Sequence, residues 1–142
     1  MKSKISENFG QTQRLGKELA KTLKGGSAVC LYGQLGAGKT TFVQGLAKGL
    51  GIKQRITSPT FIIVRKYKIS KSSVKSFYHI DLYRIDTSSD IKNLGLDEIL
   101  NDKNALVVIE WAEKFGSELP KKRIDIYFEN IGKDERKITW SK

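Results

Sequence analysis

Residues 27–50 read SAVCLYGQLGAGKTTFVQGLAKGL. The short apolar run 28–32, bounded by glycines, predicts a buried strand. The apolar positions of 41–50 recur with the spacing of one helix face, and Gly51 follows as a stop signal. Between these two segments, 33–40 has the pattern G-x-x-x-x-G-K-T, which is the Walker A motif. The order of strand, glycine loop and helix therefore predicts an α/β fold built around a phosphate-binding loop.

Each residue type in this loop suits the binding of a nucleotide. Glycines let successive backbone N–H groups point at phosphate oxygens, and the N-terminus of the following helix adds a partial positive charge. Lys39 reaches the β- and γ-phosphates in such a loop, and the Thr40 hydroxyl ligates magnesium. The alternative is a glycine-rich turn that matches the pattern by accident. The strand before the loop and the helix after it favour the nucleotide site.

Such a site needs a second magnesium anchor, normally an acidic residue at the carboxyl end of a neighbouring buried strand. Glu110 follows the most apolar run of the chain and fits this place. The alternative is that Glu110 caps its strand at the surface. Asp81 is the other candidate carboxylate, which would hold the attacking water or the water shell of the metal. Its alternative is a surface pair with Arg84, in which His79 is a partly buried core residue.

Further elements follow from periodicity and turn signals. We expect a helix over 12–24 and a short helical segment over 90–100. A central strand is expected over 105–109. Two hairpins are expected, one joining 61–69 to 77–83 and a closing one joining 124–128 to 137–140. A length of 142 residues without an internal repeat or linker predicts a single domain over 1–142.

The charge is unevenly distributed. The chain has 26 Lys and Arg against 15 Asp and Glu, a formal net charge of +11. Residues 1–80 carry +13 and residues 81–142 carry −2, so the first part can present a positive field to a polyanion. The alternative is an ordinary solvated, lysine-rich surface.

The remaining composition indicates the cellular compartment of the protein and disfavours some kinds of site and enzyme. The lone Cys30 lies in an apolar run and is expected to be a buried, unreactive thiol. We expect a cytoplasmic protein without membrane contact, because no apolar run could span a bilayer and no secretory signal opens the chain. One Cys and one His exclude a Cys/His metal site. The guanine-reading sequence Asn-Lys-x-Asp is absent, which favours ATP. The absence of arginine between Arg84 and Arg123 weakens the prediction of a small-molecule kinase.

Four motifs follow one another along the chain: GQLGAGKTT at 33–41, TSPTF at 57–61, HIDLYR at 79–84 and IEW at 109–111. In this order they resemble the TsaE (YjeE) family, the bacterial ATPases of tRNA threonylcarbamoyladenosine synthesis. The sequence QTQRLG at 11–16 is similar to the family's opening Glu-Thr-x-x-Leu-Gly, with Gln11 in place of the acid. The resemblance covers nearly the whole chain.

The resemblance implies a single-domain P-loop NTPase fold, in which helices flank a mixed, mostly parallel sheet with antiparallel hairpins. Asp81 would support hydrolysis, Thr60 in the switch-like segment 57–60 would sense the γ-phosphate, and Trp111 would pack beside the nucleotide site or a partner. The implied catalytic residues are Lys39, Asp81, Glu110 and Thr60, and the implied magnesium ligands are Thr40 and Glu110. The implied ATP-binding residues are Gly33, Leu35, Gly36, Ala37, Gly38, Lys39, Thr40, Thr41 and Thr12, the last of these near the adenine.

The resemblance also implies an accessory role. Proteins of this family do not modify tRNA themselves but bind the TsaD–TsaB pair, in which TsaD is the threonylcarbamoyl transferase, and their ATP cycle resets that complex. We therefore expect a weak Mg²⁺-dependent ATPase that is stimulated by its partners and reaches tRNA indirectly through their complex. Two alternatives stay open, a small-molecule P-loop kinase and a nucleotide-gated binding module with negligible hydrolysis.

Overall fold

The computed structural model describes residues 1–34, 36–56, 64–69, 74–85, 88–92 and 94–141. Strands and helices alternate along most of the chain. The elements are β1 (Lys2–Ser6), α1 (Phe9–Ala20), β2 (Ala28–Tyr32), α2 (Lys39–Gly49), β3 (Val64–Lys68), β4 (Ser76–Asp81), α3 (Ser88–Lys92), α4 (Leu96–Leu100), β5 (Ala105–Glu110), the 3-10 helix η1 (Ala112–Glu118), β6 (Ile124–Asn130) and β7 (Arg136–Ser141).

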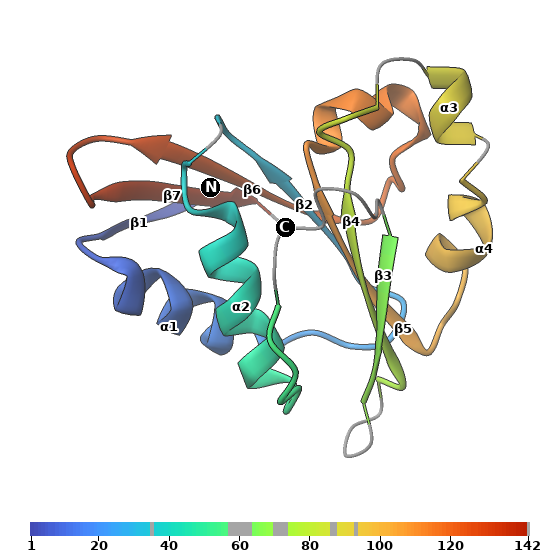
Figure 1. Cartoon of the computed structure of the whole chain (residues 1–142), viewed down its shortest axis with the longest axis horizontal. Coiled ribbons are helices and arrows are strands. Elements are labelled where there is room, and N and C mark those ends of the chain that lie inside the picture. The colour runs from blue at the N-terminus through green and yellow to red at the C-terminus, as the bar shows by residue number, and fades with distance from the viewer. Residues whose placement is uncertain (35, 57–63, 70–73, 86–87, 93, 142) are drawn as a thin grey trace.

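The strands form one seven-stranded sheet in the order β1-β7-β6-β2-β5-β4-β3 (Figure 1). The four central strands β6, β2, β5 and β4 run parallel, whereas β1–β7, β7–β6 and β4–β3 are antiparallel pairs. The mixed α/β sheet and the antiparallel pairing of both predicted hairpins are confirmed, whereas residues 61–63 of the first hairpin lie outside the described residues. The six strand pairs divide equally between parallel and antiparallel, which is a more even mixture than we expected.

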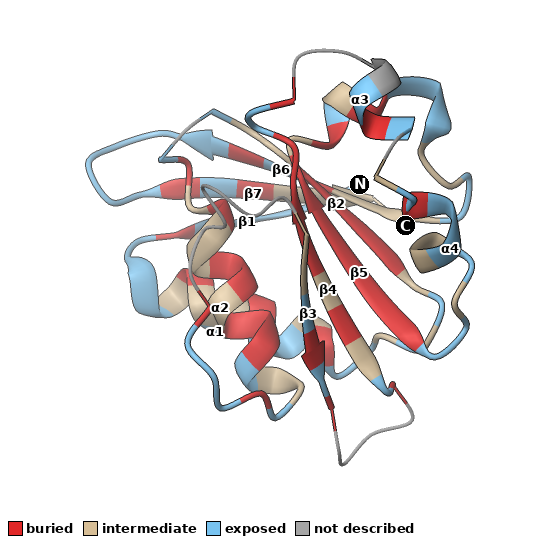
Figure 2. Cartoon of the chain, turned by 45° about the vertical axis from the view of Figure 1, so that its right-hand side comes forward, coloured by how far each residue is buried: buried red, intermediate tan, exposed pale blue. Residues whose placement is uncertain are grey.

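Helices cover the sheet on both faces. Alternate residues of β2 point to opposite sides, so Val29 and Leu31 pack with Phe42 of α2, whereas Cys30 packs with Ile91 of α3 and elements near it. All six residues of β5 are buried, and Figure 2 shows the central strands as the most buried part of the molecule. A parallel strand covered on both faces is expected to be apolar throughout, and this explains the continuous apolar run of β5.

The helices α1 and α2 approach each other through glycines. A Cβ atom on Gly45 would lie 1.9 Å from the main-chain oxygen of Gln13, and one on Gly16 would lie 2.2 Å from that of Phe42. No Cβ atom fits at such distances. The two glycines therefore fix how closely α1 lies against the helix that follows the glycine loop.

Some boundaries differ from the predicted ones. The first helix spans Phe9–Ala20 rather than 12–24, because the Asn8 side chain accepts a hydrogen bond from the Gln11 N–H and caps an earlier start. The segment 90–100 contains two short helices instead of one, and the second starts after Gly95 in the left-handed conformation. The edge strand β1 and η1 were not predicted.

Cys30 is fully buried, as expected, and burial raises the pKa of its thiol to about 12. No helix in the described part of the chain has the length and apolar character needed to cross a membrane.

Candidate functional site

The candidate site lies where the parallel strands end. The glycine loop follows β2, Asp81 is the last residue of β4, and Glu110 is the last residue of β5. Register places Asp81 directly beside Glu110, and Glu110 beside Leu31 of β2. Ligands of open α/β sheets bind outside the carboxyl ends of their strands, so the predicted residues from separate parts of the sequence meet at the expected edge.

The described glycines of the loop have the backbone geometry that its sequence predicts. Gly36 and Gly38 have φ angles of +79° and +97°, which glycine adopts without strain. Within the described part of the chain, no side chain caps the N-terminus of α2 at Gly38, so the first N–H groups of this helix are left to other acceptors. The loop therefore offers the donor-rich helix N-terminus that suits a phosphate.

Lys39 is buried and lies inside the site. Its ammonium donates a hydrogen bond to the main-chain oxygen of Gly33 and lies 3.5 Å from the centroid of the Trp111 ring. Burial lowers the pKa of Lys39, and the nearby carboxylates, of which Glu110 acts most strongly, oppose this shift. The Lys39 ammonium thus lies over the Trp111 ring and near several carboxylates, of which Glu110 has the strongest effect.

Glu110 links two other side chains. Its Oε1 accepts a hydrogen bond from the Thr40 hydroxyl at 3.4 Å, and its Oε2 bonds to Nε2 of His79. Glu110 is only 2% exposed and His79 is 0% exposed. The alternatives in which Glu110 is a surface cap and His79 is a partly buried core residue are therefore wrong.

Asp81 is buried as well. Its Oδ1 accepts a hydrogen bond from the Tyr83 N–H at 2.9 Å, which turns the carboxylate toward the end of its own strand. Burial argues against the alternative of a surface pair with Arg84. Asp81 and Glu110 are both close enough to Lys39 to raise its pKa.

Trp111 has the left-handed backbone conformation, with a φ of 60°. This conformation ends β5 abruptly and starts η1, and the indole ring lies against Lys39 on one side and 5.1 Å from the Tyr83 ring. Lys114 donates hydrogen bonds to the main-chain oxygens of Tyr83 and Ile85. These contacts join η1 to the segment that follows Asp81.

Sequence reasoning did not predict the position of Arg136. This buried residue at the start of β7 donates from Nη2 to the Gly36 oxygen at 3.2 Å and from Nη1 to the Glu135 oxygen at 3.0 Å. Its side chain lies near Gly38 as well. No local signal marks Arg136, because its proximity to the loop depends on β7 pairing with β6, and β6 with β2.

The other predicted residues have different outcomes. Thr12 is buried, its hydroxyl lies 2.7 Å from that of Ser6, and its methyl group lies near Gly38. Thr41 lies in the first turn of α2 and is half-buried. Leu35 and Thr60 lie outside the described residues.

A magnesium ion fits the donors that the structure brings together. The Thr40 hydroxyl and the Glu110 carboxylate are hard oxygen ligands, which Mg²⁺ prefers. Among the described residues, no three His, Cys, Asp or Glu side chains gather to hold a metal by themselves. The protein would therefore supply part of the coordination, and phosphate and water oxygens the rest.

These features define an α/β protein with a glycine loop and two buried carboxylates at the carboxyl edge of its parallel strands. The sequence model described as "Threonylcarbamoyl adenosine biosynthesis protein TsaE" matches residues 6–138. The chain is 40% identical over 134 residues to the "tRNA threonylcarbamoyladenosine biosynthesis protein TsaE" of Bacillus subtilis, covering 94% of this chain and 81% of the relative. It is 38% identical to the protein of that name from Treponema pallidum over 135 residues, 95% of this chain and 96% of the relative.

A solved structure supports the same relationship. The crystal structure of YdiB from Bacillus subtilis superposes with a TM-score of 0.81 at 34% sequence identity, covering 98% of this chain and 83% of that one. The chain belongs to the TsaE family, whose members act in tRNA threonylcarbamoyladenosine biosynthesis. The family predicted from the four motifs is confirmed.

Proposed function

We propose that this protein binds Mg²⁺–ATP, hydrolyses it, and serves as an accessory ATPase in the threonylcarbamoyl modification of tRNA adenosine. One observation carries the proposal: the Thr40 hydroxyl at the start of α2 lies 3.4 Å from the buried Glu110 carboxylate at the end of β5. A loop hydroxyl and a strand-end acid at hydrogen-bond distance are the pair that anchors magnesium in P-loop proteins.

Each residue of the site has a role in this proposal. Loop N–H groups and Lys39 bind the phosphates, while Thr40 and Glu110 hold the metal, which when bound neutralises charge on the phosphate oxygens. His79 keeps the Glu110 carboxylate in place through its hydrogen bond. Asp81, beside Glu110 in the sheet, orients the attacking water or accepts its proton. The role of Thr60 in sensing the γ-phosphate stays a prediction from the resemblance.

The accessory role rests on family membership and on the cations of the site. Arg136 is near the loop, but its guanidinium donates to main-chain oxygens, those of Gly36 and Glu135 among them. A second cation for the transition state would then come from a partner, as arginine fingers do in other P-loop systems. We propose that the TsaD–TsaB pair is this partner and that the protein reaches tRNA through it. We also propose that ATP hydrolysis and tRNA modification take place in the cytoplasm.

The chemistry can be tested with the matched variants Thr40→Ser and Thr40→Val. Serine keeps the hydroxyl and valine keeps the shape without it, so we expect Mg²⁺-dependent phosphate release to survive in Thr40→Ser and to fall about 10- to 100-fold in Thr40→Val. Equal rates in the two variants would contradict the assignment of Thr40.

The alternative functions predict different products. A small-molecule kinase would transfer the labelled γ-phosphate of ATP to a metabolite, whereas the proposed ATPase releases it as inorganic phosphate. A binding module with negligible hydrolysis would bind ATP through Lys39 and show no change of phosphate release on Asp81→Ala. Thin-layer separation of the labelled products distinguishes the three.

A further inference from the structure

Two neighbouring hollows lie along α1, α2 and the segment 51–56. The larger has a volume of 760 Å³ and the smaller one of 230 Å³, and Gln13 and Lys48 line both. We call these two hollows together the basic groove, because five cationic side chains among the described residues line them, namely Arg14 and Lys17 on α1, Lys48 on α2, and Lys53 and Arg55 after α2. All five are exposed.

Among the residues that the structure describes, no acidic side chain lines the basic groove. The two acids of residues 1–80 are Glu7 and Glu18, and Glu18 lines a separate hollow with Lys2 and Lys4. Among the described residues, the ion pairs are His79–Glu110 and Arg123–Asp125, so no ion pair neutralises a groove cation. The positive field of this groove is therefore available to an external anion.

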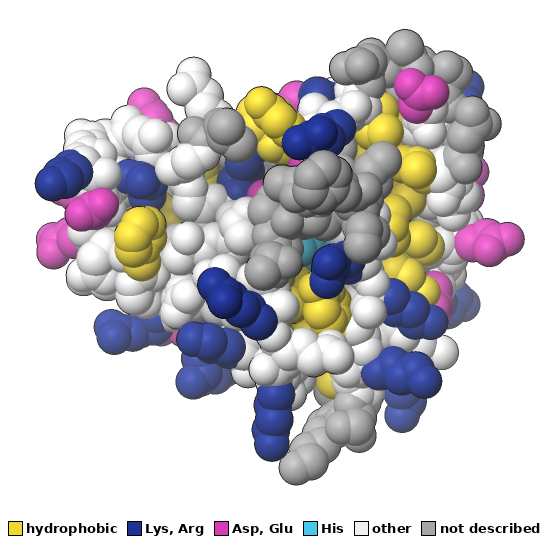
Figure 3. All heavy atoms as spheres, viewed as in Figure 1, with side chains coloured by type: hydrophobic (Ala, Val, Ile, Leu, Met, Phe, Trp, Pro, Cys, Tyr) yellow, Lys and Arg dark blue, Asp and Glu magenta, His cyan; other side chains and the backbone are white. Residues whose placement is uncertain are grey.

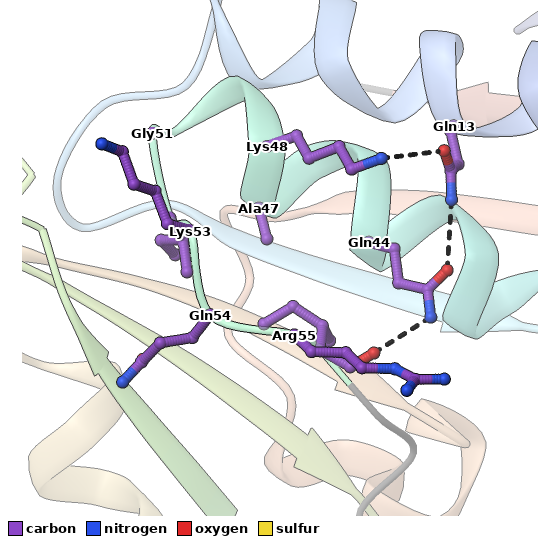
Figure 4. A pocket seen from close by; sticks show the side chains of 10 residues that line it. Gln13, Gln44, Ala47, Lys48, Gly51, Lys53, Gln54 and Arg55 are labelled. Carbon is purple, nitrogen blue, oxygen red and sulfur yellow. Dashed lines mark hydrogen bonds between the residues drawn. The ribbon is translucent and has the colours of Figure 1, made fainter.

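Hydrogen bonds between neutral amides hold the floor of the basic groove (Figure 4). Gln13 donates to the Gln44 side chain at 3.2 Å, and Gln44 donates to the main-chain oxygen of Ile56 at 3.0 Å. Lys48 donates to Gln13 at 3.4 Å, whereas Lys53 and Arg55 extend in opposite directions from the segment after α2. The floor joins three elements, and it leaves the outer cations free to contact a ligand.

The positive charge around the groove covers a larger area than a single small ligand would contact. Arg14 and Lys17 are three residues apart and therefore lie on one helix face. Figure 3 shows Lys and Arg side chains over the lower half of the face of the molecule that it displays. A string of regularly spaced phosphates matches an extended row of unpaired cations better than a single phosphate does.

We propose that the basic groove binds the phosphate backbone of RNA directly. This inference goes beyond the proposed function, in which tRNA is reached only through partner proteins. It does not depend on ATP hydrolysis, because none of the five cations belongs to the nucleotide site. RNA binding and ATP hydrolysis can therefore fail or succeed separately.

The test uses the full chain, a fluorescent unmodified tRNA transcript and anisotropy titrations at several salt concentrations without nucleotide. The groove variant carries Lys17→Gln, Lys53→Gln and Arg55→Gln. A control variant carries Lys121→Gln, Lys122→Gln and Lys133→Gln, which removes the same charge from exposed positions before β6 and in the β6–β7 turn. Circular dichroism and phosphate release verify that both variants fold. If the groove variant does not fold, the single variant Arg55→Gln replaces it.

We expect the unchanged chain to bind the transcript with a steep salt dependence. The groove variant should bind at least about tenfold more weakly, with a slope of log K against log salt that is less steep by about one for each lost phosphate contact. The control variant should lose less than about twofold. Equal losses in both triple variants, or no binding by the unchanged chain, would overturn the proposal. So would a groove variant that binds tRNA normally but no longer binds the TsaD–TsaB pair, because the groove would then fit a protein.

Discussion

His79 on β4 and Glu110 on β5 form a hydrogen bond inside the protein, between Nε2 of the imidazole and Oε2 of the carboxylate. A carboxylate that binds magnesium is ionised and only accepts hydrogen bonds, so His79 is the donor when Glu110 serves as a magnesium ligand. The other carboxylate oxygen, Oε1, is then left for the Thr40 hydroxyl. A residue outside the nucleotide loop thereby sets the direction in which the proposed magnesium ligand points.

This relationship predicts that His79 is a positioning residue for magnesium. His79→Leu removes the donor at nearly constant volume, and we expect the Mg²⁺ concentration for half-maximal phosphate release to rise about 10- to 100-fold. His79→Gln keeps an N–H group in reach of Oε2 and should recover part of this loss. The measurement is a magnesium titration of phosphate release by each variant.

A purely structural role for His79 gives another pattern. Both variants would then lower the melting temperature, and the magnesium titration would be unchanged in the fraction that stays folded. Equal magnesium dependence in His79→Leu and His79→Gln would contradict the positioning role.

Lys39 and Trp111 provide an optical signal for nucleotide binding. The chain has two tryptophans, so Trp140→Phe leaves Trp111 as the only indole. Because the Lys39 ammonium lies over the Trp111 ring, its movement to a phosphate should change the emission of that ring. We expect Mg²⁺–ATP to change the fluorescence of Trp140→Phe.

The matched control is Lys39→Met in the same background. It removes the charge but keeps an unbranched side chain, and ATP affinity should fall about 10- to 150-fold, which corresponds to the loss of a charged hydrogen bond. An unchanged titration in Lys39→Met would mean that Lys39 does not bind the phosphates.

The close contact at Gly45 predicts how much the free energy of unfolding falls when α1 is pushed away from α2. Gly45→Ala places a Cβ atom where the Gln13 oxygen lies, and we expect the free energy of unfolding to fall by about 1 to 3 kcal/mol. Gly10→Ala is the control on α1, because a Cβ atom there would meet only the Asn8 side chain at 3.3 Å. Urea unfolding of both variants measures the difference, and equal stability would show that the helices adjust without cost.

The burial of Cys30 predicts that its thiol does not react with thiol reagents while the protein is folded. Burial raises its pKa from 9.0 to about 12, so at pH 8 the folded protein holds an unexposed, protonated thiol. A thiol reagent such as DTNB should not react with the folded chain and should react fully in urea. Because the thiol ionises at its ordinary pKa only when unfolded, its contribution to stability is present below about pH 9 and lost as the pH rises above it. Rapid reaction of the folded protein at pH 8 would contradict the burial of Cys30.

Local sequence patterns predicted the parts of the site that depend on neighbours along the chain. The apolar run 28–32, the glycines and Lys39 define strand, loop and helix within one segment, and Glu110 is recognisable because it ends the most apolar strand. The hairpin of β3 and β4 and that of β6 and β7 follow from alternation and short turns.

The remaining contacts depend on the order of strands in the sheet. His79 meets Glu110 because β4 pairs with β5, and Arg136 meets Gly36 because β7 lies two strands from β2. Nothing within either residue's own segment specifies those pairings. The edge strand β1 was missed for the same reason, since Lys2–Ser6 carries no apolar alternation and is a strand through its pairing with β7.

We propose that the chain is an ATPase whose activity serves the TsaD–TsaB complex. The most direct test of this function is phosphate release from Mg²⁺–ATP by the purified protein, alone and with the TsaD–TsaB pair, with Glu110→Ala as the blank. We predict feeble release alone, an increase of at least about tenfold with the pair, and background values for Glu110→Ala. If the protein binds ATP but the TsaD–TsaB pair does not change its rate of phosphate release, this function is contradicted.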